Sequence, residues 1–149
     1  MKRHSWYIVL VLVGLIFIGA TQASAQKKIK KEVVAWPAED IKWNQLKGAP
    51  PGVMSTNLWG DQTKGAYGGL TKFPAGFKSP LHYHSNDIKL VVIKGAYVLN
   101  GKTYGPGSYL FIPGGEKHVS GGAEDSESIF FIEQPGKFDV KPVEPPKKK

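Results

Sequence analysis

The 149-residue chain contains no cysteine and a single arginine, Arg3. Without cysteine, the chain can form neither a disulfide bond nor a thiolate metal site, and no cysteine can act as a nucleophile. Nucleic-acid-binding domains gather arginines, lysines and aromatic residues on one folded face. Although the formal net charge is +8, much of the excess lies in lysine runs near the two ends, so we expect no nucleic-acid partner.

A long apolar run is also absent except near the start of the chain. Residues 1–25 resemble a secretory signal peptide, with a basic start, an apolar run at 6–20 and the small-x-small sequence Ala23-Ser24-Ala25. The run is shorter than the roughly 20 residues that a membrane-spanning helix needs. We expect cleavage near Gln26, export to a bacterial periplasm or secretion, and no integral membrane span afterwards. An uncleaved N-terminal anchor is the alternative.

Sustained helical periodicity is missing after the apolar run. From Val53 onward, short β-prone segments alternate with glycine, proline, asparagine and aspartate, a pattern that predicts an all-β sandwich or barrel. The expected strands are 53–59, 66–73, 79–84, 88–94, 96–99, 108–112, 117–121 and 128–133. Asn100-Gly101 predicts a hairpin turn.

The expected strands divide the rest of the chain into three parts. We expect residues 26–52 to be a lead-in that packs on the barrel, with one turn of helix after Pro37. Residues 53–135 would form the barrel. Residues 136–149 are rich in proline and lysine, which indicates an extended arm or a disordered tail.

Three of the four histidines lie between residues 76 and 122. His82 and His84 are two residues apart, so on an extended strand both imidazoles project to the same side. A strand carrying His118 would bring a third imidazole alongside them. Three neutral imidazoles can hold zinc, iron, nickel, copper or manganese.

The spacing of these residues resembles two sequence motifs of the cupin family. In the first, G-x5-H-x-H-x3/4-E-x6-G, the chain matches at Gly76, His82, His84 and Gly95; in the second, G-x5-P-x-G-x2-H-x3-N, it matches at Gly107, Pro113, Gly115 and His118. The resemblance implies a cupin-type double-stranded β-helix, or jelly-roll barrel. It also implies one divalent transition metal on the three histidines, and a homodimer.

The chain departs from the cupin pattern at the glutamate of the first motif. That position falls at Ile88 or Lys89, and neither replaces a carboxylate. Asp87 is a candidate fourth ligand if a bulge turns it inward; as alternatives, it is an exposed turn residue, or water completes the site. Three histidines alone leave the metal's +2 charge uncompensated, which favours an anionic ligand.

Other candidates would bind a substrate rather than the metal. Lys89 is a candidate cation for an anionic substrate, although an outward-pointing strand lysine is the plainer interpretation. Tyr97 and Tyr109 are candidate hydroxyl donors to the pocket. No residue is assigned a catalytic role from the sequence.

The segment from Gly68 to Phe77 running into His82-Tyr-His-Ser85 also resembles exported single-domain cupins of unassigned activity, and the cupin half of a zinc-dependent anti-sigma factor. Cupins with three histidines and no glutamate, such as acetylacetone and cysteine dioxygenases, use ferrous iron. We therefore expect a metal-binding cupin, with Fe(II) or Zn(II) ahead of Mn, Ni and Cu, for a small anionic or oxygen-chelating molecule. A dioxygenase, an isomerase or a hydrolase would fit. The alternatives are a non-catalytic binding or sensing module, and a structural barrel with vestigial histidines.

Overall fold

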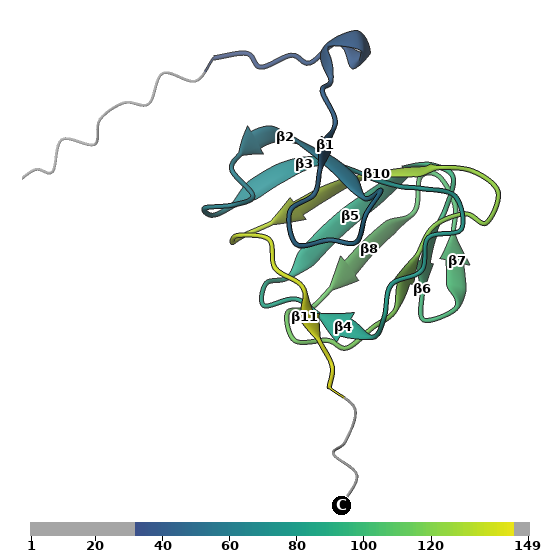
Figure 1. Cartoon of the computed structure of the whole chain (residues 1–149). Helices are drawn as coiled ribbons and strands as arrows, with labels where there is room; N and C mark the ends of the chain where they lie inside the picture. Colours follow the sequence, from purple (N-terminus) through teal and green to yellow (C-terminus); the bar gives the residue numbers. More distant parts are fainter. Residues whose placement is uncertain (1–31, 145–149) are drawn as a thin grey trace, which may run out of the picture. The chain divides into compact units, whose positions relative to one another are not determined.

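The computed structural model describes residues 32–144 (Figure 1). The chain divides into two units after Val34, and every element below belongs to the unit that begins at Ala35. The predicted signal peptide, residues 1–25, lies outside the described residues. Within residues 32–144, no helix is long and apolar enough to cross a membrane.

Strands dominate the described part of the chain, as the sequence predicts. A single 3-10 turn, η1 (Ala38–Asp40), follows Pro37 as expected. The strands are β1 (Asn44–Gln45), β2 (Met54–Gly60), β3 (Tyr67–Phe73), β4 (His82–Tyr83), β5 (Ile88–Lys94), β6 (Tyr97–Leu99), β7 (Lys102–Tyr104), β8 (Tyr109–Ile112), β9 (Ser120–Gly121), β10 (Ser128–Gln134) and β11 (Lys141–Pro142). The all-β prediction is therefore confirmed.

The strands pair antiparallel throughout and form three sheets. The largest has the order β1-β2-β3-β10-β5-β8, a second has the order β7-β6-β9, and a third pairs β11 with β4. The order brings together strands that are far apart in the sequence, such as β3 and β10 (Figure 1).

Alternation along the strands separates a buried inner face from an outer face. In β5, Ile88, Leu90 and Val92 are buried while Lys89 and Val91 are exposed. The same period-2 pattern continues in β10, where four alternate residues from Ser128 to Gln134 are buried. The inner faces supply most of the hydrophobic core, whose larger members include Tyr67, Phe73, Tyr97 and Phe130.

The hairpin between β6 and β7 forms at the predicted Asn100-Gly101 turn. Both residues have positive φ, 50° and 82°, which is the conformation of a type I′ turn. The sequence did not predict β7 itself, nor the short strands β1 and β11, because two or three residues carry too little alternation to be recognised. The predicted strands at 79–84 and 117–121 are both shorter in the structure, where β4 and β9 each contain two residues.

Four strands begin or end at one end of the large sheet. β5 begins at Ile88, opposite Ile112 at the end of β8. β10 ends at Gln134, opposite Tyr67 at the start of β3. The segments that carry His84, His118 and the C-terminal residues enter or leave the sheet here, so we call it the histidine end.

The C-terminal segment beyond β10 returns along the barrel of its own chain. Residues 135–144, which we call the arm, are extended and include β11, which pairs with β4 (Figure 1). The arm is also fixed by a backbone hydrogen bond from Phe138 N to Gln62 O, 2.8 Å long. The segment therefore takes part in the structure around the histidines.

Candidate metal centre

His82, His84 and His118 form one buried cluster. Each offers a ring nitrogen, and these three ligand atoms lie within 4.8 Å of one another. The ring centroids are separated by 4.5 Å for His82–His118, 5.0 Å for His82–His84 and 5.5 Å for His84–His118. The structure thus brings together the three histidines that the sequence predicts as metal ligands.

The backbone fixes where each histidine sits. His82 and His118 are joined by reciprocal hydrogen bonds, His82 N to His118 O at 3.0 Å and His118 N to His82 O at 2.8 Å. His84 follows β4, and its carbonyl accepts a hydrogen bond from Gly115 N at 2.8 Å. The loop between β8 and His118 is therefore pinned to both ends of the His82–His84 segment.

Each ring donates its Nδ1 hydrogen to a backbone carbonyl. His82 Nδ1 lies 2.8 Å from Pro80 O, and His118 Nδ1 lies 2.9 Å from Glu116 O. His84 Nδ1 is hydrogen bonded to Asp139 O. A carbonyl oxygen can only accept, so each Nδ1 carries the hydrogen and each Nε2 keeps a lone pair. This is the arrangement that orients histidine ligands in metal sites.

Burial favours the neutral form of His84 and His118. It lowers the pKa of His84 to about 4, against the weaker opposing effect of the hydrogen bond to Asp139, and the neighbouring His82 and His118 lower it further. Burial also lowers the pKa of His118. Neutral imidazoles at neutral pH are the protonation state that metal binding requires.

One ligand atom is fully buried as well as without a hydrogen-bond partner in the described part of the chain. His118 is 1% exposed, and its Nε2 is buried without a hydrogen bond. Buried polar atoms are rarely left unsatisfied. The unpaired nitrogen, the shared tautomer and the neutral donor set all fit a divalent transition metal held by the three Nε2 atoms.

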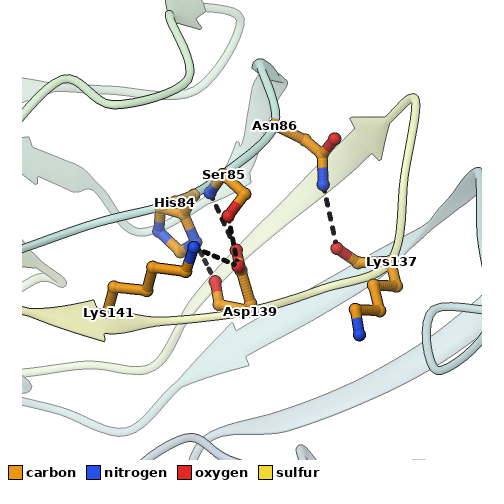
Figure 2. A network of polar contacts seen from close by, with 6 residues as sticks. All are labelled: His84, Ser85, Asn86, Lys137, Asp139 and Lys141. Carbon is orange, nitrogen blue, oxygen red and sulfur yellow. Dashed lines mark hydrogen bonds and ion pairs between the residues drawn. The ribbon is translucent and has the colours of Figure 1, made fainter.

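The arm positions His84 (Figure 2). The carbonyl of Asp139 accepts from His84 Nδ1, while the Asp139 carboxylate accepts from Ser85 N at 2.8 Å and Ser85 Oγ at 2.6 Å. Lys141 lies 3.7 Å from the same carboxylate, and Asn86 Nδ2 donates to Lys137 O at 3.1 Å. The arm is therefore hydrogen bonded along residues 84–86.

A cavity of about 390 Å³ adjoins the histidines. Its polar lining consists of Thr71, Ser79, His82, His84, Tyr97 and Ser120. The remaining lining is apolar and includes Phe138 and Val140 from the arm. None of the described residues that line it is aspartate, glutamate, lysine or arginine. The cavity therefore suits a molecule with an apolar body and one polar group directed at the histidines.

Tyr97 reaches the cavity, and its hydroxyl is already engaged. Tyr97 Oη and Ser120 Oγ are 2.8 Å apart. Burial raises the pKa of Tyr97 to about 12, so the phenol stays protonated at neutral pH. It can donate to a bound molecule but is a poor base.

The structure does not bring the other predicted residues to the cluster. Asp87 is exposed, and its carboxylate caps the loop by accepting from Gly114 N at 2.8 Å. Lys89 is exposed on the outer face of β5, and Tyr109 is 61% exposed on β8. Their alternation with the buried Ile88 and Leu110 turns them away from the cavity.

Two residues of this region were missed by the sequence analysis. The carbonyl of Asp139 is hydrogen bonded to His84, which lies 55 residues earlier in the sequence. A local sequence pattern does not predict a contact between residues so far apart. Gln134 is fully buried on the inner face of β10. Extending the apolar alternation of that strand by one residue would have placed Gln134 inside.

Comparison with known proteins supports the fold. A family model described as a domain of unknown function, DUF4437, matches residues 32–148. No curated protein matches the chain in sequence. The polyketide cyclase RemF from Streptomyces resistomycificus is similar in structure, with a TM-score of 0.63 and 21% identity, over 78% of this chain and 89% of RemF.

Two further structures share the architecture. A cupin-like protein of unknown function from Ralstonia eutropha has a TM-score of 0.60 and 21% identity, over 71% of this chain and 74% of that one. A chain of the Rhodobacter sphaeroides complex of SigE with the anti-sigma ChrR has a TM-score of 0.52 and 23% identity, over 66% and 50%. At these identities the likeness shows the fold, and the predicted cupin fold is confirmed.

Proposed function

Since the chain belongs to the DUF4437 family and has a cupin fold, we propose that it is an exported metal-binding cupin. In this proposal His82, His84 and His118 hold one divalent transition metal, Fe(II) or Zn(II) ahead of Mn, Ni and Cu. The site binds or transforms a small molecule that carries an oxygen-chelating or anionic group.

One observation carries the proposal: the three buried rings share one tautomer. Each Nδ1 hydrogen is given to a backbone carbonyl, and the ligand atoms converge within 4.8 Å. Histidines that merely fill a polar pocket have no reason to free all three Nε2 atoms. Such an arrangement is instead expected of ligands oriented for a metal.

The cavity defines which molecules we expect to bind. A bound divalent metal would supply a positive centre for chelating oxygens and, if it were iron, redox chemistry with oxygen. The chain itself contributes an uncharged wall, with the Tyr97 hydroxyl as a donor. The arm residues Phe138 and Val140 shield the polar group from water. We therefore propose a mainly apolar molecule with one chelating head, and a dioxygenase as the most specific reaction.

A non-catalytic binding or sensing module is the second candidate. The observation that favours it is the lack of an acid–base side chain among the lining residues, where only His82, His84 and Tyr97 can titrate. The histidines are assigned to the metal, and the raised pKa of Tyr97 keeps its phenol protonated at neutral pH, so it has no free site to accept a proton. Without a general base in the cavity, any reaction would depend on the metal. Binding of a molecule without reaction requires no acid–base side chain.

Elemental analysis of protein without a histidine tag tests the proposal. We expect about one metal per wild-type chain and almost none in His84→Ala. Bound iron would lead to oxygen-consumption assays with diketone-like and thiol substrates. Bound zinc would lead to hydrolysis, isomerisation and ligand-binding assays. If neither protein bound Fe(II), Zn(II), Mn(II), Ni(II) or Cu(II), even after incubation, the proposal would be wrong.

Export is proposed from residues 1–25 alone. We expect expression in a Gram-negative bacterium to give a periplasmic protein whose first residue lies near Gln26. Cell fractionation and N-terminal sequencing would test this. A full-length chain in the membrane fraction would indicate an uncleaved anchor.

A homodimer is proposed through the outer face of β5 and β8. Val91, Ile93, Tyr109 and Phe111 are exposed there, Val91 opposes Tyr109, and β8 ends the large sheet. Apolar side chains clustered on one face suit an interface with a second copy. By light scattering we expect Phe111→Lys to halve the mass, whereas the control Thr103→Lys, on β7, leaves it unchanged. A monomeric wild-type protein would refute the dimer.

A further inference from the structure

Gln134 is the one side chain within residues 32–144 whose buried amide has no partner for either polar atom. It is 0% exposed, and both Nε2 and Oε1 lack a hydrogen bond, with less than 1 Å² of either atom accessible. Folded proteins rarely leave both ends of a buried amide unsatisfied. An occupant absent from the protein atoms is therefore expected next to Gln134.

The register places Gln134 on the inner face at the histidine end. It follows Phe130 and Ile132 along the buried face of β10, and it pairs with Tyr67 across β3. On the other side, the Glu133–Lys89 pair of β10 and β5 puts Ile88 next to Gln134. Because neighbouring inner-face residues of paired strands lie side by side, Gln134 and Ile88 are adjacent.

Ile88 links Gln134 to the histidine cluster. Of the inner-face neighbours of Gln134, Ile88 and Ile132 line the same cavity as His82 and His84, whereas Tyr67 does not. Ile88 begins β5 four residues after His84 in the sequence, and it is the position where the shorter spacing of the cupin motif places its carboxylate. The amide of Gln134 is therefore next to Ile88, the position at which the cupin motif has a carboxylate ligand and this chain has none.

We propose that the carboxamide oxygen of Gln134 is the fourth protein ligand of the metal held by the three histidines. His118 Nε2 and the Gln134 amide share two properties, burial from water and lack of any partner. A metal ion is small enough for such an enclosed place and would satisfy both His118 Nε2 and Gln134 Oε1, whereas the Nε2 hydrogens of Gln134 would need a separate acceptor such as a buried water. This inference rests on the proposed function, since it requires the three-histidine metal site.

The identity of the fourth ligand has a chemical consequence. An amide oxygen is neutral, whereas the motif's glutamate would cancel one of the metal's two charges. With Gln134 as the ligand, the site keeps its full +2 charge while gaining an oxygen donor. The preference for an anionic or chelating molecule in the cavity is therefore retained.

The test compares Gln134→Leu, Gln134→Glu and the control Ser55→Ala by Zn(II) and Co(II) affinity in chelator competition. Ser55 is also a buried polar residue of the large sheet, on β2, but it does not line the cavity. We expect Gln134→Leu to weaken binding by at least about tenfold and to change the visible spectrum of the Co(II) protein. Gln134→Glu should bind at least as tightly as wild type, and Ser55→Ala should resemble wild type in both affinity and spectrum.

The outcomes separate the two proposals. If wild type binds no metal, the proposed function itself fails. If wild type and Gln134→Leu bind Zn(II) equally and have the same Co(II) spectrum, the inference alone is wrong, and Gln134 hydrogen bonds a buried water. If circular dichroism shows that Gln134→Leu does not fold, the Gln134→Glu variant is used instead. Unchanged Co(II) absorption in Gln134→Glu would overturn the inference. Altered Co(II) absorption with retained metal affinity would support it.

Discussion

The histidines of the cluster are held in two different ways. His82 and His118 use carbonyls only two residues away in the sequence, those of Pro80 and Glu116, and their backbones bond each other. His84 depends on Asp139, 55 residues later, in the arm. The rings of two ligands are therefore oriented by nearby carbonyls of the barrel and the ring of the third by the arm, although the arm also pairs with the backbone of β4. We therefore expect that loss of a histidine held by the barrel nearly abolishes metal binding, whereas loss of the arm weakens it by misorienting the ring of His84.

Removing a barrel-held ligand should have the largest effect. We expect His82→Ala and His118→Ala each to weaken Zn(II) binding by more than about 100-fold, because loss of a ligand should exceed the 10–100-fold cost of losing a group that orients one. Chelator competition would measure this. Near wild-type affinity in either variant would remove that histidine from the site.

Replacing the arm should have a smaller effect, because it removes the acceptor of His84 and the pairing of β11 with β4 but no ligand. With residues 137–143 exchanged for a Gly-Ser segment of equal length, we expect metal affinity to fall by about 10–100-fold, since His84 loses its acceptor. The amide hydrogens of His82 and His118 should stay protected in hydrogen exchange, because they bond each other. If their protection disappears as well, the arm holds the barrel together and the distinction fails.

Asp139→Ala should loosen the arm without removing the carbonyl that His84 uses. The variant loses the hydrogen bonds from Ser85 N and Oγ, and we expect the free energy of unfolding to fall by about 1–3 kcal/mol. Urea denaturation of metal-free protein measures this. The effects of Asp139→Ala and Ser85→Ala should not add in the double variant, because they partly remove the same contact. Full additivity would mean that the two side chains act separately.

Asn86→Ala should have the smallest effect. Its amide donates one hydrogen bond to Lys137 O at the exposed start of the arm, so we expect at most about 0.5–1.5 kcal/mol of lost stability. Metal affinity should match wild type, which makes this variant a control for Asp139→Ala. A loss of stability equal to that of Asp139→Ala would show that the whole arm docks as one unit.

Local patterns in the sequence predicted the parts of the site that local structure determines. Alternation put His82 and His84 on one face, and the second motif placed His118 beside them. The same rule, applied strictly to the apolar residues Ile88 and Leu90, would have turned Lys89 outward in advance. The predicted strand over β5 agrees with the structure at both ends.

The remaining features depend on contacts that a sequence pattern does not encode. The hydrogen bond between His84 and Asp139 joins two residues outside the strands that are 55 positions apart in the sequence, and β11 is too short to show alternation. The predicted strand at 128–133 ends one residue before Gln134, where two successive polar residues, Glu133 and Gln134, no longer show which of them is buried. The register with Tyr67 shows that the strand continues through Gln134 and buries this amide.

The arm also sets an order of events during biogenesis. His84 leaves the ribosome well before Asp139, since synthesis proceeds from the N-terminus and segments fold as they emerge. A nascent or unfolded chain therefore has its histidines but lacks the acceptor that orients one of them. We expect the complete site to form only after the arm has docked, so that metal is acquired at the end of folding, in whichever compartment folding finishes.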